Sequence, residues 1–146
     1  MELTRESPEH PDVLTLCLAQ RAELAERDKV AFEQSPLHLD PAIRFTVAWS
    51  AGQAIGCAGL QPLEPGAGEL KRMYVLPAER GRGVARALLA EIERMAADQG
   101  MTAIRLETGR GFDDVIRLYT SAGFRPIPLF GPYLDNTESA CFEKRL

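Results

Sequence analysis

The chain is organised around one stretch, which reads Met73-Tyr74-Val75-Leu76-Pro77-Ala78-Glu79-Arg80-Gly81-Arg82-Gly83-Val84-Ala85-Arg86. This order predicts a strand that leads through a basic, glycine-containing turn into a helix. The first turn of a helix has backbone N–H groups without intrahelical partners and carries the positive end of the helix dipole. Gly81 and Gly83 let the backbone approach a ligand closely. The stretch therefore predicts a site for a phosphate or pyrophosphate.

The charges around this turn support the same interpretation. Between Glu69 and Arg86 the chain has five basic and two acidic residues, a local charge of +3, whereas the net charge of the chain is -4. The basic residues are Lys71, Arg72, Arg80, Arg82 and Arg86. A short Gly-x-Gly pattern with a solvated basic face also occurs where no ligand binds. The turn alone therefore leaves both interpretations open.

Length and composition predict one globular domain over residues 1–146, because 45% of the residues are hydrophobic and 26% are charged. The acidic net charge argues against nucleic acid or a membrane surface as a partner, since proteins that bind these carry broad positive fields. No apolar run is long enough to span a bilayer, and the first residues lack the apolar core of a signal peptide. We therefore expect a cytoplasmic protein.

The three cysteines are Cys17, Cys57 and Cys141. They are far apart in the sequence and lack the close spacing of a zinc site or a redox motif. This pattern predicts three buried, small hydrophobic side chains and no metal.

The N-terminal segment predicts a short strand followed by one amphipathic helix. The strand is expected at residues 3–5. Ser7 followed by Pro8 resembles an N-cap with proline at the first helical position. Apolar residues at helical spacing then continue to about Arg27.

The next segment is less regular. Residues 28–34 predict a second short helix or a continuation of the first, and the two prolines in 35–41 predict a loop. His38 in this loop is either simply exposed or a base that faces a substrate.

Strands and helices alternate in the rest of the chain. The predicted strands are 43–49, 54–60, 69–76, 103–108, 124–127 and 139–146. The first two are close enough to form a hairpin, and residues 62–68 form a loop before the third. Apolar residues at a period of 3.6 predict a helix that starts near Ala85 and ends at Gly100, and another helix over 115–122. Because a helix connects them, strands 69–76 and 103–108 should be parallel.

Two motifs carry a resemblance to a known family. Arg80, Gly83 and Ala85 form the first, and Leu118-Tyr119 followed by Gly123-Phe124 forms the second. With the order of elements between them, they resemble the GCN5-related N-acetyltransferases (GNAT). The resemblance implies an α/β structure of the α+β type with the acyl-CoA N-acyltransferase fold. Its central sheet should be mixed and mostly antiparallel, with about seven strands flanked by about four helices.

The resemblance also implies acetyl-CoA as cosubstrate, without a metal. The pyrophosphate would lie on the backbone of the basic turn, and the pantetheine arm would pair with the end of strand 69–76, which splays away from its neighbour. An amide N–H near Val75 would stabilise the oxyanion. The residues expected to bind the cofactor are Met73, Tyr74, Val75, Arg80, Gly81, Arg82, Gly83, Val84, Ala85 and Arg86.

Three side chains are candidates for proton transfer. Tyr119 matches the family's general acid, which protonates the leaving thiolate; otherwise it is a helix tyrosine with its ring packed and its hydroxyl in solvent. Glu69 falls where some members place a base, and Glu107 is the second candidate. Members that use a water chain leave both glutamates as exposed strand residues. Phe112 and Asp113 depart from the amide side chain that relatives often place at the start of the last helix.

The acceptor is the least determined part. Phe130 and Tyr133 are candidate walls of its pocket, and Arg72 or Arg44 is a candidate for holding an acidic acceptor. The tail at 139–144 resembles small bacterial members, some of them linked to indole-acetic acid metabolism.

We expect transfer to the amine of a small molecule or an amino-acid-like compound, by direct attack in a ternary complex. The alternatives are a peptide or protein N-acetyltransferase and an acyl-CoA-binding sensor without catalysis. Exposed sheet edges make a homodimer reasonable.

Overall fold

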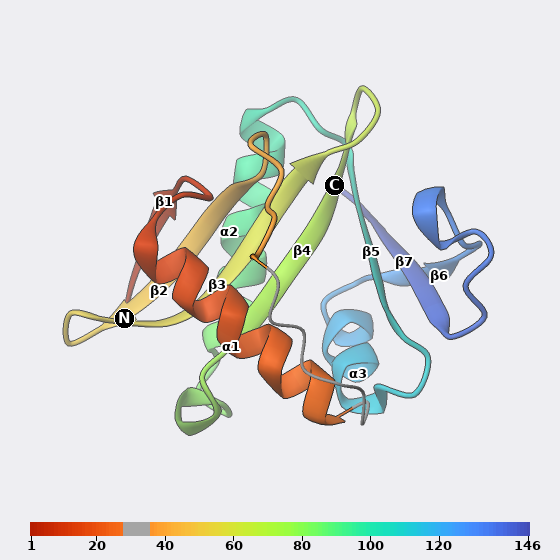
Figure 1. Cartoon of the computed structure of the whole chain (residues 1–146). Coiled ribbons are helices and arrows are strands. Elements are labelled where there is room, and N and C mark those ends of the chain that lie inside the picture. Colours follow the sequence, from red (N-terminus) through yellow and green to blue (C-terminus); the bar gives the residue numbers. More distant parts are fainter. Residues whose placement is uncertain (28–35) are drawn as a thin grey trace.

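Seven strands form one sheet in the order β1-β2-β3-β4-β5-β7-β6 in a computed structural model that describes residues 1–27 and 36–146 (Figure 1). The strands are β1 (Glu2–Glu6), β2 (Arg44–Ser50), β3 (Gln53–Pro62), β4 (Ala67–Val75), β5 (Ala103–Gly109), β6 (Arg125–Ile127) and β7 (Ser139–Arg145). The helices are α1 (Pro11–Arg27), α2 (Val84–Asp98) and α3 (Asp113–Ser121). Short 3₁₀ turns at Pro77–Glu79 and Gly131–Tyr133 complete the described elements.

The predicted mixed sheet is confirmed. Among the described strands, β4 and β5 are the one parallel pair, as expected from the α2 crossover, and the other neighbours are antiparallel. The expectation of about four helices was slightly too high, because the described residues contain three α-helices. The additional helix expected at 28–34 lies outside the described residues. None of the described helices is both long and apolar enough to cross a membrane.

The two faces of the sheet carry different helices, with α1 in front and α2 behind in Figure 1. The spacing that predicted α2 is that of its buried face, since Leu88, Leu89 and Ile92 belong to one core cluster with Ile104 and Leu106 of β5. A second cluster joins α1 to β2 and β3.

The cysteines are buried, as expected. Two of them that are distant in the sequence meet in the α1 cluster, where Cys17 of α1 and Cys57 of β3 share a hydrogen bond. Their separation along the chain gave no sign of this contact.

Helix α1 begins later than Ser7 and Pro8 suggested. It starts at Pro11, and the Nδ1 atom of His10 accepts a hydrogen bond from the backbone N–H of Asp12 at 3.1 Å. The Ser7 hydroxyl instead accepts from the N–H of Glu9, within a turn. The helix therefore does have proline at its first position, but it is capped by a histidine, which is an uncommon N-cap residue.

Strands β4 and β5 separate soon after they meet. Their pairing covers Ala67–Glu69 against Ala103–Arg105, and the remaining residues of the two strands diverge. On the other side of β4, the register with β3 shifts between Cys57 and Gly59. Arg72 has a positive φ of 59° in this bulge, a conformation that costs free energy in a non-glycine residue. Beyond Glu69, the side of β4 that faces β5 therefore has no strand partner. We call this separation of the two strands the opening between β4 and β5, and Glu69, the last paired residue of β4, its vertex.

Candidate active site

The basic turn leads directly from β4 into α2, as predicted. Gly81 has a φ of 78°, and Gly83 has a φ of 81° at the N-cap of α2. No side chain caps this helix end, so the N–H groups of its first turn remain available to an anion. A Cβ atom placed on either glycine meets no heavy atom within 4 Å, which shows that both face open space. The start of α2 therefore has the free backbone donors and the open space that the predicted anion site requires.

The arginine side chains around the turn are engaged within the protein. Arg80 donates from Nε to the carbonyl oxygen of Val75 at 2.9 Å, and its Nη2 atom forms an ion pair with Glu23 at 2.8 Å. Arg86 donates to the Ser121 hydroxyl at 2.7 Å, and Arg82 lies 3.5 Å from the Glu79 carboxylate. The guanidinium groups of the turn thus have partners within the protein, whereas no side chain caps the backbone N–H groups at the start of α2.

The end of β4 presents one edge to the opening. The N–H of Leu76 donates to the carbonyl of Ile55 in β3 at 2.9 Å. Backbone groups alternate in direction along a strand, so those of Met73 and Val75 point away from β3. Their carbonyls indeed accept from other partners, since Gln20 donates to the Met73 carbonyl at 2.8 Å. The N–H of Val75 consequently points away from β3, toward the opening.

Helix α1 borders the opening through side chains that the sequence did not single out. Gln20 contacts β4, Glu23 holds Arg80 and accepts from the Tyr74 hydroxyl at 3.3 Å, and Arg27 forms an ion pair with Asp114 of α3 at 2.5 Å. The spacing of three and four residues puts all three on one side of the helix. That polar stripe is the only sequence signal of the contacts, and it does not identify their partners.

The ring of Phe112 packs under the Arg27 guanidinium at 4.1 Å. Phe112 and Asp113, which lack the amide side chain that relatives often have at the start of the last helix, thus lie next to the contact between Arg27 and Asp114. Arg27 also holds the pKa of Asp114 below its usual value, chiefly through the hydrogen bond.

Tyr119 lies in α3 and is buried in the same core cluster as Val75 and Leu106. Its ring meets that of Phe124 edge-on at 5.7 Å. Burial raises the pKa of the Tyr119 phenol, so the group keeps its proton at neutral pH. Tyr119 is only 6% exposed, and its role as general acid stays a prediction.

The two candidate bases share one face of the sheet. Glu69 pairs with Arg105 across β4 and β5, and Glu107 lies two residues further along β5, so all three side chains point to the α1 side. Glu69 is 3% exposed and accepts a hydrogen bond from the Tyr133 hydroxyl at 2.7 Å. Glu107 accepts from the Ser139 hydroxyl at 2.5 Å.

The segment before β7 contributes aromatic side chains to this face. Phe130 and Tyr133 meet edge-on with their ring centroids 5.4 Å apart. The Arg105 guanidinium lies 5.9 Å from the Phe130 ring and pairs with Glu64 and with Glu143. The expectation that Phe130 and Tyr133 line a pocket is compatible with this placement.

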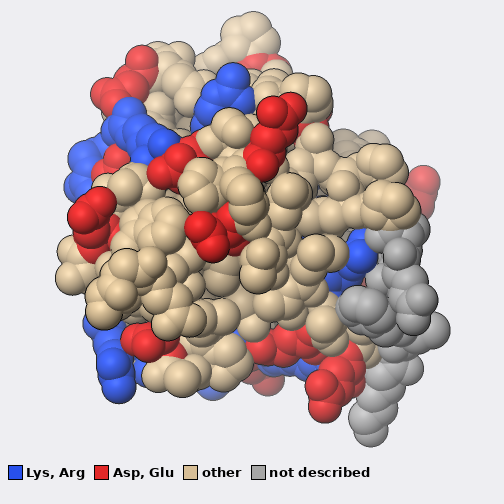
Figure 2. Space-filling view, turned by 60° about the vertical axis from the view of Figure 1, so that its left-hand side comes forward, with Lys and Arg blue, Asp and Glu red and all other residues tan. Residues whose placement is uncertain are grey.

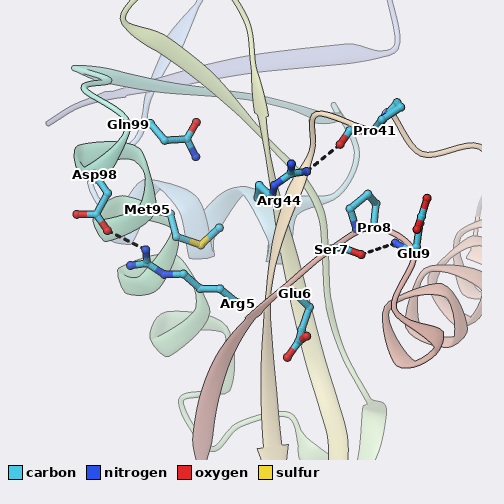
Figure 3. Close-up of a pocket in the computed structure, with 10 residues that line it drawn as sticks. All are labelled: Arg5, Glu6, Ser7, Pro8, Glu9, Pro41, Arg44, Met95, Asp98 and Gln99. Atoms are coloured by element: carbon cyan, nitrogen blue, oxygen red, sulfur yellow. Dashed lines mark hydrogen bonds and ion pairs between the residues drawn. The ribbon is translucent and has the colours of Figure 1, made fainter.

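The other acceptor candidates lie elsewhere. Arg44 donates to the carbonyls of Pro41 and Ile43 and borders an open cavity of about 530 Å³ between β1, the start of β2 and the C-terminal end of α2 (Figure 3). The cavity is separated from the basic turn by the length of α2, about 20 Å. His38 is exposed. Neither residue belongs to the opening between β4 and β5.

The face of the molecule shown in Figure 2 carries charges of both signs. On the face shown in Figure 2, acidic and basic side chains are interspersed around a wide area of uncharged residues. A continuous positive field would be expected on a nucleic-acid-binding face.

Comparison with known proteins identifies similar chains. Residues 8–124 match the acetyltransferase (GNAT) family. An IAA acetyltransferase from Azospirillum brasilense is 42% identical over 107 residues, which cover 73% of this chain and 70% of that protein.

Solved structures extend the similarity over the whole chain. A Klebsiella pneumoniae structure named as an acyl-CoA N-acyltransferase has a TM-score of 0.84 and 30% identity, covering 99% of this chain and 97% of that one. A GNAT acetyltransferase from Elizabethkingia anophelis with acetyl-CoA bound shares the fold at a TM-score of 0.74 and 18% identity, covering 99% of this chain and 97% of that one.

Proposed function

Because this chain belongs to the acetyltransferase (GNAT) family and is an acetyl-CoA-dependent acetyltransferase, we propose that it acetylates the amine of a small molecule or an amino-acid-like compound. The transfer is a direct attack by the amine in a ternary complex. One observation carries the proposal: the opening between β4 and β5 has the uncapped start of α2 at its wide end and the buried carboxylate of Glu69 at its vertex.

The residues at the wide end fit acetyl-CoA. The free N–H groups at the start of α2 suit its pyrophosphate, and the open space at Gly81 and Gly83 lets the phosphates approach the backbone. The outward edge of β4 at Met73 and Val75 is available to the pantetheine arm. We propose that the expected set at 73–75 and 80–86 binds through this backbone, while Arg80 ties the turn to α1.

The chemistry then needs two proton transfers. The acceptor nitrogen forms a bond to the acetyl carbon, and the bond from that carbon to sulfur breaks. Glu69 lies six residues before Val75 on β4, so it receives the proton that the nitrogen loses through a chain of water molecules. Tyr119 gives a proton to the departing thiolate. The Val75 N–H stabilises the oxyanion, a contribution of about 3 kcal/mol for a preorganised donor.

Glu69 is the better placed of the two carboxylates. It lies at the vertex and is almost wholly buried, whereas Glu107 lies further along β5 and is only partly buried. We therefore give Glu69 the role of base and leave Glu107 beside the acceptor.

The charges favour an acceptor that arrives as a cation. Glu69 and Glu107 have hydroxyl partners, and the nearby guanidinium of Arg105 already pairs with Glu64 and Glu143. An ammonium group is attracted to such carboxylates, whereas a carboxylate-bearing acceptor is repelled. The position of Arg44 at the distant cavity removes one of the two arginines expected to hold an acidic acceptor.

The roles can be separated by substitution. Tyr119→Phe should lower kcat by about a hundredfold, since general acids contribute factors of this order, and should leave the dissociation constant of acetyl-CoA unchanged. Glu69→Gln should also lower kcat and leave the dissociation constant of acetyl-CoA unchanged. Glu107→Gln is the matched control, and its kcat should fall less. Calorimetry gives the affinity and thiol release gives kcat. Wild-type turnover in Tyr119→Phe would exclude its acid role.

A further inference from the structure

Tyr133 holds the proposed base from outside both family motifs. It lies in the 3₁₀ turn between β6 and β7, and its hydroxyl donates to the Oε2 atom of Glu69 at 2.7 Å across 64 positions of sequence. Among the described residues, this is the one side-chain hydrogen bond to the Glu69 carboxylate. The buried base therefore depends on a residue from a distant segment for its orientation.

The hydroxyl can only act as a donor here. Burial, first, and then the hydrogen bond to Glu69 raise the pKa of Tyr133 well above that of a free tyrosine. The phenol keeps its proton at any pH at which the enzyme works, and a carboxylate oxygen accepts it. The bond therefore has a single direction and fixes one of the two carboxylate oxygens.

The turn that carries Tyr133 is itself held in place. The N–H of Tyr133 donates to the Phe130 carbonyl at 3.0 Å, and the two rings meet edge-on. The turn follows β6, whose Ile127 pairs with Cys141 of β7, and Cys141 in turn pairs with Glu107 of β5. The phenol is thus anchored to the sheet through its own backbone and ring.

We propose that Tyr133 is a positioning residue, which holds Oε2 of Glu69 so that Oε1 is kept free to receive the acceptor's proton. This inference rests on the proposed role of Glu69 as base. A carboxylate with two equivalent rotamers would present its free oxygen to that proton for only part of the time. The hydrogen bond from Tyr133 selects one of them.

Tyr133→Phe removes the hydroxyl and keeps the ring contact with Phe130. We expect kcat to fall about tenfold, as for the loss of one hydrogen bond to a charged group. The dissociation constant of acetyl-CoA should stay within twofold of wild type, because the cradle at α2 is untouched. Ser139→Ala, which removes the hydroxyl on Glu107, is the matched control and should change kcat less. Urea unfolding verifies that both variants are folded.

A double-mutant cycle tests whether Tyr133 acts through Glu69. In the Glu69→Gln background, Tyr133→Phe should have less than a twofold effect on kcat, because the base it positions is gone. Where that background is too slow to measure, Glu69→Asp replaces it, since the shorter carboxylate loses the Tyr133 contact. A purely structural role for Tyr133 would instead give the same tenfold loss in either background.

The outcomes separate the two ideas. Wild-type kcat in Tyr133→Phe, or additive losses in the cycle, would overturn the positioning role and leave Glu69 as the base. Wild-type kcat in Glu69→Gln would overturn the base assignment, and the positioning role with it.

Discussion

Gly83 offers the sharpest perturbation of the anion cradle. It is the N-cap of α2 with a φ of 81° and a ψ of 10°, and a Cβ atom there meets no heavy atom within 4 Å. A side chain at this position therefore causes no clash in the free protein. Its cost is the left-handed backbone, about 1 to 2 kcal/mol for a residue with a Cβ atom.

Two substitutions separate backbone strain from charge. Gly83→Ala should lower the free energy of unfolding by about 1 to 2 kcal/mol. It should raise the dissociation constant of acetyl-CoA only a few fold. Gly83→Asp adds a carboxylate where the phosphates would lie and lets it compete for the first-turn N–H groups. Losing one hydrogen bond to a charged group costs about 1.5 to 3 kcal/mol. Repulsion between unit charges about 4 Å apart adds up to about 4 kcal/mol near a protein surface.

These free energies predict that Gly83→Asp raises the dissociation constant of acetyl-CoA by at least about a hundredfold, since each 1.4 kcal/mol changes a binding constant tenfold. The assay is calorimetric titration of wild type and both variants, with urea unfolding at the same pH as the control for folding. A folded Gly83→Asp variant that binds acetyl-CoA as tightly as wild type would refute the placement of the pyrophosphate.

Two further predictions concern the contacts of α1. The side chains of Glu23 and Arg80 are 38% and 45% exposed, so their ion pair should contribute little to stability. A double-mutant cycle of Glu23→Gln and Arg80→Gln, measured by urea unfolding, should give a coupling free energy of about 0.3 to 1 kcal/mol. A coupling of zero would mean that the ion pair does not hold the turn. Asp114 has a lowered pKa in the folded protein, so its charge stabilises the fold above its unfolded pKa of about 3.9, and this contribution is lost as the pH falls through the folded pKa. Asp114→Asn should thus be slightly less stable than wild type in urea at pH 7 and equally stable at a pH below the folded pKa; a difference that persists there would contradict the assignment to the charge.

The sheet could be predicted because local signals agreed with the long-range structure. The period of 3.6 in α2 fixed its buried face, and the helical crossover fixed the parallel pairing of β4 with β5. The two motifs placed Gly83 and Tyr119 in an acetyltransferase before any geometry was known.

The start of α1 was misplaced because two prolines compete for the first helical position. Pro8 follows a serine, the commoner N-cap, whereas Pro11 follows His10, whose ring nitrogen caps the helix. Residue preferences alone therefore place the start of the helix at Pro8, whereas the structure has it at Pro11.

The contacts around the site could not be predicted, because they join residues far apart in the chain. The ion pair of Arg80 with Glu23 and the hydrogen bond of Tyr133 to Glu69 leave no periodic or motif signal in the sequence. For the same reason the sequence showed Arg80 only as part of a basic turn, whereas in the structure its guanidinium is bound to Glu23 of α1 and to the carbonyl of Val75. The roles of Tyr119, Glu69 and Glu107 stay predictions.

The central claim is transfer of an acetyl group to an amine at the opening between β4 and β5. The most direct measurement is release of free CoA thiol from acetyl-CoA in the presence of a panel of amines, with cationic amines and carboxylate-bearing amino acids side by side. Our account predicts saturable release that requires an amine, is fastest with a cationic acceptor and falls about a hundredfold in Tyr119→Phe. Tight binding of acetyl-CoA without release for any amine or peptide would contradict the account and favour an acyl-CoA sensor.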